Sequence, residues 1–218
     1  MKKSLLSFAI IALISFTSCK KESTEDATKT DEASESSASG SYTVDAASSV
    51  IDWVGSKPAG KHTGTISLAD GSFDVTDGNV TGGNFTIAMN SITVTDLEGE
   101  DKMNLETHLK GTGDKESEDH FFNVTKYPTG NFKMLSAEPE SGAYFIKGIL
   151  TLKGISKEVS FAAEIIMSDT EIKLISDPFK INRTSWNVNY ASKSLFDNLK
   201  DKFINDDIEL VVKVTAKK

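Results

Sequence analysis

From Tyr42 onward, hydrophobic and polar residues alternate along most of the chain. Phe85, Ile87 and Met89 fall on one face of a strand, with Thr86 and Ala88 between them. A period of two residues is typical of strands that bury one face. The same alternation recurs at 144–152, 159–165 and 208–214, and shorter extended segments are expected at 50–54, 62–68, 72–76, 131–135, 171–175 and 179–190.

Pairs of residues that contain glycine separate several of these segments. Asp70-Gly71 and Asp77-Gly78 can adopt the positive φ angles of tight hairpin turns, so each is expected to end a strand. The pair at 82–83 is Gly-Gly, which predicts a bulge or a sharp bend. The turn signals therefore favour strands that follow one another as antiparallel neighbours.

Two stretches depart from the alternation. Residues 96–110 mix leucines with charged residues, which is more typical of an irregular helix than of a strand. Leu195, Leu199 and Phe203 stand four residues apart, and Ser194 before them is a suitable N-cap, so a second helix is expected over 194–203. The pattern predicts one all-β antiparallel domain of about eight to ten strands, and both a sandwich and a barrel fit it.

The chain begins with a basic segment followed by an apolar one. Lys2 and Lys3 precede an apolar run at 5–16, and Thr17 and Ser18 stand before Cys19, the only cysteine of the sequence. This order is typical of a secretory signal, and the run is shorter than the roughly 20 residues that cross a membrane. We interpret 1–18 as a lipoprotein signal peptide and Cys19 as the lipidated residue. The alternative is a free cysteine behind an ordinary signal peptide.

Residues 19–41 are interpreted as a lipidated, disordered, acidic tether to the domain at 42–218. Residues 20–41 hold three lysines against six acidic residues and no aromatic residue, so they cannot bury enough apolar surface to fold. The domain itself holds 19 basic and 26 acidic residues, a net charge of −7 that repels nucleic acid, and no nucleic-acid partner is expected. We expect an exported protein anchored to the bacterial cell envelope, at the periplasmic face or the cell surface, with acyl chains on Cys19 as its membrane contact.

Catalytic and metal-binding motifs are missing from the sequence. It contains no G-x-S-x-G elbow, phosphate-binding loop, C-x-x-C or H-E-x-x-H motif. The three histidines, His62, His108 and His120, have no short ligand spacing, and no pair of carboxylates has a spacing that indicates acid–base chemistry. We therefore expect neither an enzyme nor a metal site or cofactor. Of the 12 phenylalanines, ten lie in the domain at 42–218, where they fill an ordinary core or line a cavity, and the pattern leaves both possibilities open.

An ordered set of short segments extends over most of 42–218. They are YTVD at 42–45, SVIDWVG at 49–55, GKHTG at 60–64, MNSI at 89–92, HLK at 108–110, FFNV at 121–124, YPT at 127–129, IKGILTLKGI at 146–155 and FKINRTSW at 179–186. This set resembles the YceI-like family, the lipocalin-like polyisoprenoid-binding proteins. The resemblance implies an extended eight-stranded antiparallel β-barrel with one or two short helices and a long apolar lipid, of polyisoprenoid or fatty-acyl type, inside it. His120 and Lys153 depart from the residues common in the family, Asp and His respectively, which affects ligand identity if either position contacts a head group.

The resemblance and the strand pattern together give a set of expected ligand contacts. Plainer roles are open for several of them: Arg183 in a surface salt bridge, Trp53 and Trp186 in the core, and Phe121 and Phe122 as a plug at one end of the barrel. The polar head of the lipid is expected near Lys61, His62, Arg183 or Trp186, and its chain near Trp53, Phe85, Ile87, Met89, Phe121, Phe122, Tyr144, Ile146, Leu150 and Phe161.

The resulting hypothesis is a lipid-binding barrel at the cell envelope, for carriage or storage. A bilayer is as apolar as a barrel interior, so most of the gain from burying the chain cancels, which favours reversible carriage. Two alternatives remain: a surface lipoprotein whose solid barrel binds a protein partner, and a hydrolytic or metal-dependent enzyme.

Overall fold

The computed structural model describes residues 39–113 and 119–218, which belong to one compact unit. The interpretations of the signal peptide, of Cys19 and of residues 19–38 lie outside the described residues. The strands are β1 (Gly40–Val44), β2 (Val50–Lys57), β3 (Gly60–Thr76), β4 (Asn79–Ala88), β5 (Thr93–Val94), β6 (Thr129–Glu140), β7 (Ala143–Leu152), β8 (Ile155–Met167), β9 (Glu171–Ser176), β10 (Phe179–Asn182) and β11 (Asp207–Lys217). The helices are α1 (Gly99–Lys110) and the short 3₁₀ segments η1 (Ala46–Ser48), η2 (Met89–Ser91), η4 (Arg183–Trp186) and η5 (Lys200–Lys202).

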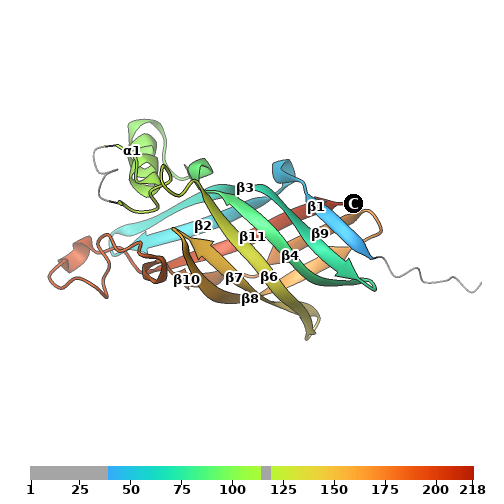
Figure 1. Cartoon of the computed structure of the whole chain (residues 1–218). Coiled ribbons are helices and arrows are strands. Elements are labelled where there is room, and N and C mark those ends of the chain that lie inside the picture. The colour runs from blue at the N-terminus through green and yellow to red at the C-terminus, as the bar shows by residue number, and fades with distance from the viewer. Residues whose placement is uncertain (1–38, 114–118) are drawn as a thin grey trace, which may run out of the picture. The chain divides into compact units, whose positions relative to one another are not determined.

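Eight strands close into a ring, as the family resemblance implied (Figure 1). The order of neighbours is β2-β3-β4-β6-β7-β8-β9-β11, and β11 returns to β2. Every one of these pairings is antiparallel. Since side chains alternate across each strand, one face of the ring points into the barrel, and the alternation in the sequence marks that face.

Two positions in the ring are each filled by two strands in succession. β1 and β2 both pair with β3 and β11, so they act as one strand interrupted by η1. β9 and β10 both pair with β11, and Asp177-Pro178 separates them. β9 also pairs with β8, whereas in the described part of the chain β10 shares no ladder with β8. The wall therefore has a seam between β10 and the first half of β8.

The turn predictions are confirmed at one pair and wrong at another. Asp77-Gly78 forms a two-residue hairpin turn between β3 and β4, with positive φ at both residues. Asp70-Gly71 does not end a strand: it lies inside β3, beside a register shift between Leu68 and Asp70. A second register shift, between Asp74 and Val75, faces the Gly82-Gly83 pair, where the sequence predicts a bulge or bend.

Of the two predicted helices, one is confirmed and one is wrong. The expected helix over 96–110 is confirmed as α1. The helix expected over 194–203 is wrong, since that segment is turns and the short η5, with positive φ at Asn198 and Lys200. The strand expected over 179–190 ends at Asn182, whose side chain accepts a hydrogen bond from the Thr184 backbone and caps η4.

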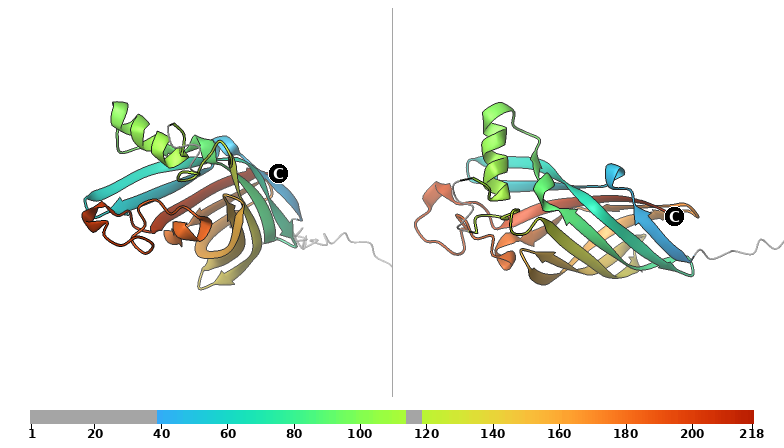
Figure 2. Two further views of the ribbon diagram at one scale, coloured as in Figure 1. Left: turned by 60° about the vertical axis from the view of Figure 1, so that its left-hand side comes forward. Right: turned by 45° about the horizontal axis from the view of Figure 1, so that its top comes forward.

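The two ends of the barrel differ. Figures 1 and 2 place α1 and the segment 187–206, which we call the cap loop, at one end, while β1 and the C-terminus lie at the other. The end near β1 is closed by buried side chains, which we call the plug: Tyr42, Val44, Val75, Ile146, Ala163, Ile172 and Ala216. The barrel is thus solid at this end, and its remaining length is where a cavity lies.

Candidate functional site: an apolar lumen

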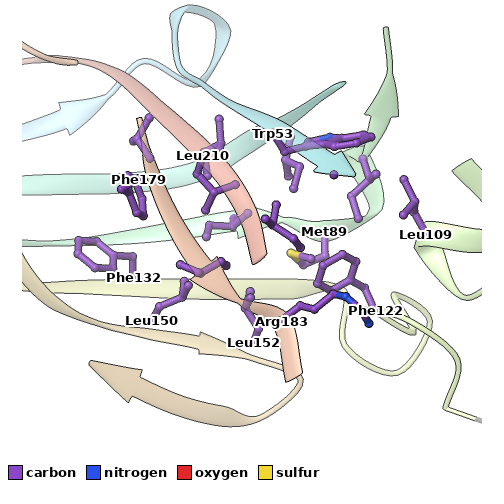
Figure 3. Close-up of a pocket in the computed structure, with 18 of the residues that line it drawn as sticks. Trp53, Met89, Leu109, Phe122, Phe132, Leu150, Leu152, Phe179, Arg183 and Leu210 are labelled. Carbon is purple, nitrogen blue, oxygen red and sulfur yellow. The ribbon is translucent and has the colours of Figure 1, made fainter. Parts of the chain in front are cut away.

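A cavity of about 310 Å³ lies inside the barrel between the plug and the cap loop. Figure 3 shows side chains from several strands converging on it, among them Trp53, Phe132, Leu150 and Leu210. The volume is at the lower end of the roughly 300–1,000 Å³ typical of ligand pockets. Most of the lining that the strands supply is apolar: Ile51, Trp53, Ile66, Leu68, Phe73, Phe85, Ile87, Phe132, Met134, Leu150, Leu152, Val159, Phe161, Leu174, Phe179, Ile181, Ile208, Leu210, Val212 and Val214.

Five phenylalanine rings form a continuous belt around this lumen. Neighbouring ring centroids are 4.9 Å apart for Phe73 and Phe85, 6.4 Å for Phe85 and Phe132, and 5.8 Å for Phe132 and Phe161. Phe161 and Phe179 stack at 4.4 Å across the seam between β8 and β10. Such contacts fix each ring against its neighbours, so the belt is a preformed wall for a hydrocarbon.

Glycines on the inner face give these rings room to lie along the wall. Gly64 is paired with Trp53, and a Cβ at Gly64 would come within 2.3 Å of the indole. A Cβ at Gly148 would come within 2.3 Å of the Phe132 ring. Each ring thus occupies the space that a neighbouring side chain would need. The lumen stays open because these rings cover glycine rather than project across the barrel.

The lumen reaches the surface at the end opposite the plug. We call this opening the mouth. His62 lies there, and its Nδ1 is 2.9 Å from Oδ2 of Asp96. Burial alone raises the pKa of Asp96, but hydrogen bonds from the Thr63 amide and from His62 outweigh it and leave that pKa below its ordinary value. The residues around the mouth are Gly55, Ser56, Lys57, His62, Leu105, His108, Leu109, Phe121, Phe122, Ile204 and Asn205.

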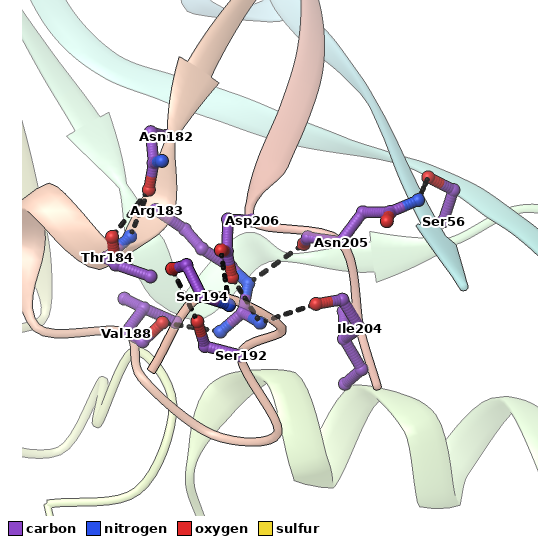
Figure 4. Close-up of polar contacts among 10 residues, drawn as sticks. All are labelled: Ser56, Asn182, Arg183, Thr184, Val188, Ser192, Ser194, Ile204, Asn205 and Asp206. Atoms are coloured by element: carbon purple, nitrogen blue, oxygen red, sulfur yellow. Dashed lines mark hydrogen bonds and ion pairs between the residues drawn. The ribbon is translucent and has the colours of Figure 1, made fainter. Parts of the chain in front are cut away.

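Among residues 39–113 and 119–218, Arg183 is the largest fully buried side chain, with 1% of its surface exposed. Figure 4 shows its guanidinium directed into the cap loop. It donates to the carbonyl oxygens of Val188, Ile204 (3.0 Å) and Asn205 (3.1 Å), and it pairs with Asp206 at 3.4 Å. Burial lowers the pKa of Arg183, and the charge of Asp206 opposes that effect. Because its hydrogen bonds go to both ends of the cap loop, Arg183 fixes that loop against the barrel.

A second buried cation holds the neighbouring loop. Lys153 follows β7 in a two-residue turn, and its Nζ donates to the carbonyl oxygens of Phe121 (2.8 Å), Asp119 (3.0 Å) and Asn187 (3.4 Å). The same Nζ is 3.2 Å from Oδ2 of Asp119. Lys153 does not line the lumen, so this departure from the family pattern serves the loop that carries Phe121 and Phe122.

His120, the other departure, lies outside the lumen lining. Its Nε2 is 2.9 Å from Nδ1 of His108, and the rings of both histidines pack against Tyr190 at 4.8–4.9 Å. This cluster joins α1, the loop at 119–128 and the cap loop. Over residues 39–113 and 119–218, no group of three or more His, Cys, Asp or Glu side chains is arranged to hold a metal ion. In the same ranges, no helix is long and apolar enough to cross a membrane.

The structure brings ten of the fourteen expected ligand contacts to the lumen. The other four lie elsewhere: Lys61 is exposed, Tyr144 and Ile146 are in the part of β7 near the plug, and Trp186 is buried with its Nε1 donating to the carbonyl oxygen of Leu150. That any of these residues contacts a ligand stays a prediction. The ten that line the lumen are Trp53, His62, Phe85, Ile87, Met89, Phe121, Phe122, Leu150, Phe161 and Arg183.

Sequence reasoning missed several lining residues. Phe132 and Phe179 complete the aromatic belt, and Leu105 and Leu109 of α1 reach the mouth. The alternation of β11 already marked Ile208, Leu210, Val212 and Val214 as one face, and all four line the lumen. Phe132 and the β11 residues could therefore have been found from strand periodicity alone.

Comparisons with known proteins agree with this geometry. The chain is similar in fold to the structure of BcnA from Burkholderia cenocepacia, with a TM-score of 0.61, 17% identity and coverage of 79% of this chain and 99% of that chain. It is also similar to a polyisoprenoid binding domain from Saccharophagus degradans implicated in plant cell wall breakdown, with a TM-score of 0.60, 14% identity and coverage of 81% and 97%. Both solved chains consist almost entirely of this fold. No curated protein matches the sequence. The profile of the YceI-like domain matches residues 42–216, and the chain therefore belongs to the YceI-like family.

Proposed function

We propose that this protein binds one chain-shaped apolar lipid, of polyisoprenoid or fatty-acyl type, in its lumen. The observation that carries the proposal is the cavity of about 310 Å³ walled by the five-phenylalanine belt and by aliphatic side chains. The similar Saccharophagus degradans structure is a polyisoprenoid binding domain, which supports the same class of ligand. An open lumen disfavours the alternative of a solid barrel that acts only through its outer surface.

The size of the lumen sets what it can enclose. At about 30 Å³ for each water-sized group, the cavity holds roughly ten such groups, which corresponds to a chain of about ten carbon atoms. Burying about ten methylene groups is worth on the order of 8 kcal/mol relative to water. A longer polyisoprenoid would leave its remaining units at the mouth. Because a bilayer offers the chain a similar environment, binding is expected to be reversible, which suits carriage or storage near a membrane.

The polar head of the ligand is expected at the mouth. Arg183 lines the lumen, but its donors are engaged by the cap loop carbonyls and by Asp206, so it has little left to offer a head group. His62, with about a third of its side chain exposed, and the exposed Lys57 lie at the opening. We therefore assign head-group contact to these two residues rather than to Arg183.

Native mass spectrometry of residues 36–218, followed by solvent extraction, tests the proposal. The domain is incubated with a fatty acid or a polyprenyl phosphate, and the full-length chain, purified from a bacterial envelope, is examined in the same way. We expect one lipid per chain, and we expect its loss in Leu210→Trp, which fills the lumen. Val211→Trp, on the outward face of the same strand, is the matched control and should retain lipid. The proposal would be refuted if the wild-type chain neither carried lipid on purification nor took up lipid on incubation. Equal amounts of bound lipid in the two tryptophan variants, at matched thermal stability, would refute it as well.

We also propose that the protein is exported and anchored to the cell envelope through Cys19. The support is the sequence order of a basic start, a short apolar run and small residues before the cysteine. Metabolic labelling with an alkyne fatty acid should mark the wild-type chain and leave Cys19→Ser unmarked. Label on both chains, or on neither, would contradict this assignment.

A further inference from the structure

We propose that the tip of the cap loop docks on an anionic lipid bilayer, with the mouth of the barrel beside the membrane. This inference rests on the proposed function, because it names the bilayer as the source of the bound lipid. Leu195 and Phe196 are adjacent in the sequence, and 52% and 49% of their surfaces are exposed. Two large apolar residues at a loop tip are costly to leave in water and favourable at a membrane interface.

The tip is held in place rather than left loose. The guanidinium of Arg183 binds carbonyls at both ends of the cap loop, at Val188 and at Ile204 and Asn205. Within the loop, the Ser194 backbone amide donates to Asp206 at 3.3 Å. Leu195 directly follows this fixed residue. The apolar tip is therefore presented by a braced loop, which lowers the entropy lost on docking.

The cap loop also forms part of the mouth. Ile204 and Asn205 line the opening, and Tyr190 packs against His108 of α1 with ring centroids 4.8 Å apart. Figure 2 shows the loop projecting from the end of the barrel opposite β1 and the C-terminus. A bilayer that receives this tip would lie next to the opening of the lumen. A lipid could then pass between membrane and lumen with little of its chain exposed to water.

The charge of the projecting elements selects an anionic surface. Residues 190–203 carry three lysines and two aspartates, a net charge of +1, and the β2–β3 turn at 57–61 adds two lysines. These two segments sum to +3, whereas the rest of the domain at 42–218 carries −10, since the whole carries −7. α1 carries three acidic residues and two lysines, a net of −1. The cap loop as a whole, 187–206, is neutral because it also contains Asp206, which pairs with Arg183. The positive charge therefore lies in the outer part of the cap loop, 190–203, and in the turn. Basic residues beside an apolar tip are attracted to anionic lipid head groups.

Flotation of residues 36–218 with lipid vesicles tests the inference. Vesicles of phosphatidylcholine alone are compared with vesicles that also contain phosphatidylglycerol. We expect binding to the anionic vesicles, weakened about tenfold or more by Leu195→Gln with Phe196→Gln. Replacing a lysine of the cap loop with glutamine should weaken binding about fivefold per lysine, and only on anionic vesicles. The lysines to replace are Lys193, Lys200 and Lys202. The matched control is Ile166→Gln with Ile175→Gln, on β8 and β9, where 57% and 46% of the side chains are exposed.

A second measurement separates this inference from the proposed function. Lipid uptake is followed from detergent micelles and from vesicles. If wild-type protein takes up lipid from both, the Leu195/Phe196 double variant should lose uptake from vesicles and keep uptake from micelles. The docking inference would be overturned if the wild type bound no vesicles, or bound both lipid compositions equally. It would also be overturned if the Leu195/Phe196 variant and the Ile166/Ile175 control lost vesicle binding to the same extent. Failure of uptake by both routes would instead refute lipid binding. Loss of self-association rather than of vesicle binding in the double variant would identify the tip as a protein interface and also overturn docking.

Discussion

Replacing Arg183 with methionine tests whether this residue fixes the cap loop. Methionine keeps much of the length and apolar volume of the side chain but has no donor. The carbonyl oxygens of Val188, Ile204 and Asn205 each lose a charged donor, and Asp206 loses its cationic partner. Asp206 keeps the hydrogen bond from the Ser194 amide, so its carboxylate is not left without any partner.

The expected cost follows from these contacts. A buried acceptor that loses its partner costs about 1–3 kcal/mol, and breaking a buried ion pair by removing one member costs about 3–5 kcal/mol. These values are not additive, because the carbonyls share one donor group and part of the loop faces water. We expect a loss of about 3–5 kcal/mol, a large fraction of the 5–15 kcal/mol that stabilises a typical domain. For a domain of this size, the midpoint of thermal unfolding should fall by roughly 6–20 °C.

Urea unfolding of residues 36–218, followed by tryptophan fluorescence, measures this change. Arg183→Lys is the control, since it retains a charge but cannot reach three carbonyls at once, and its loss should be intermediate. Lipid selectivity among head groups should be the same in all three proteins at temperatures where they are folded. A methionine variant within about 0.5 kcal/mol of the wild type that has lost head-group selectivity would refute our reasoning. It would return Arg183 to the ligand-binding role expected from the sequence.

Three further predictions concern the same barrel. Lys153→Met should destabilise the domain by about 2–4 kcal/mol, because the carbonyl of Phe121 loses its donor, and limited proteolysis at 119–128 should accelerate; unchanged cleavage would contradict this. Gly148→Ala should displace the Phe132 ring into the lumen and also push the strand away from the Lys133 carbonyl oxygen, which a Cβ would approach to 2.6 Å. We expect lower lipid occupancy in native mass spectra and a cost of about 3 kcal/mol, whereas Gly82→Ala, where a Cβ meets ordinary contacts, should cause neither. Burial raises the pKa of Asp206, but hydrogen bonds from Ser192 and Ser194 and the charge of Arg183 outweigh it and lower that pKa overall. Its stabilising contribution is therefore present above a pH of about 4 and lost as the pH falls through the lowered pKa, so Asp206→Asn should flatten the acid side of the stability curve measured in urea.

The strands were predictable because alternation reports directly on burial. Phe85, Ile87 and Met89 were assigned to one face, and all three line the lumen. The same pattern could not separate the lumen from the plug: Ile146 and Leu150 share a face of β7, but only Leu150 lines the cavity. That difference depends on position along the barrel axis, which periodicity does not contain.

The cap loop shows a different limit of sequence reasoning. The spacing of Leu195, Leu199 and Phe203 is helical, but a helix forms in water mainly when its apolar face has a surface to cover. Leu195 is exposed, and Asn198 has a positive φ that interrupts a helix. Likewise Arg183 has the same local sequence whether it binds a head group or three carbonyls 5 to 22 residues away. Every residue has a backbone carbonyl, so the sequence cannot show which carbonyls fold against the guanidinium of Arg183.

The interruption at Asp177-Pro178 gives the wall of the barrel one compliant side. Elsewhere around the ring, widening the barrel requires breaking backbone hydrogen bonds between neighbouring strands. Between β10 and the first half of β8 the described chain has no ladder, and the stacked rings of Phe161 and Phe179 close the wall. Parting two rings costs only apolar contact, which a branched or thicker hydrocarbon would restore from within. The width of the lumen can therefore change at this seam, and the thickest ligand that fits depends on how far β10 and β8 can separate.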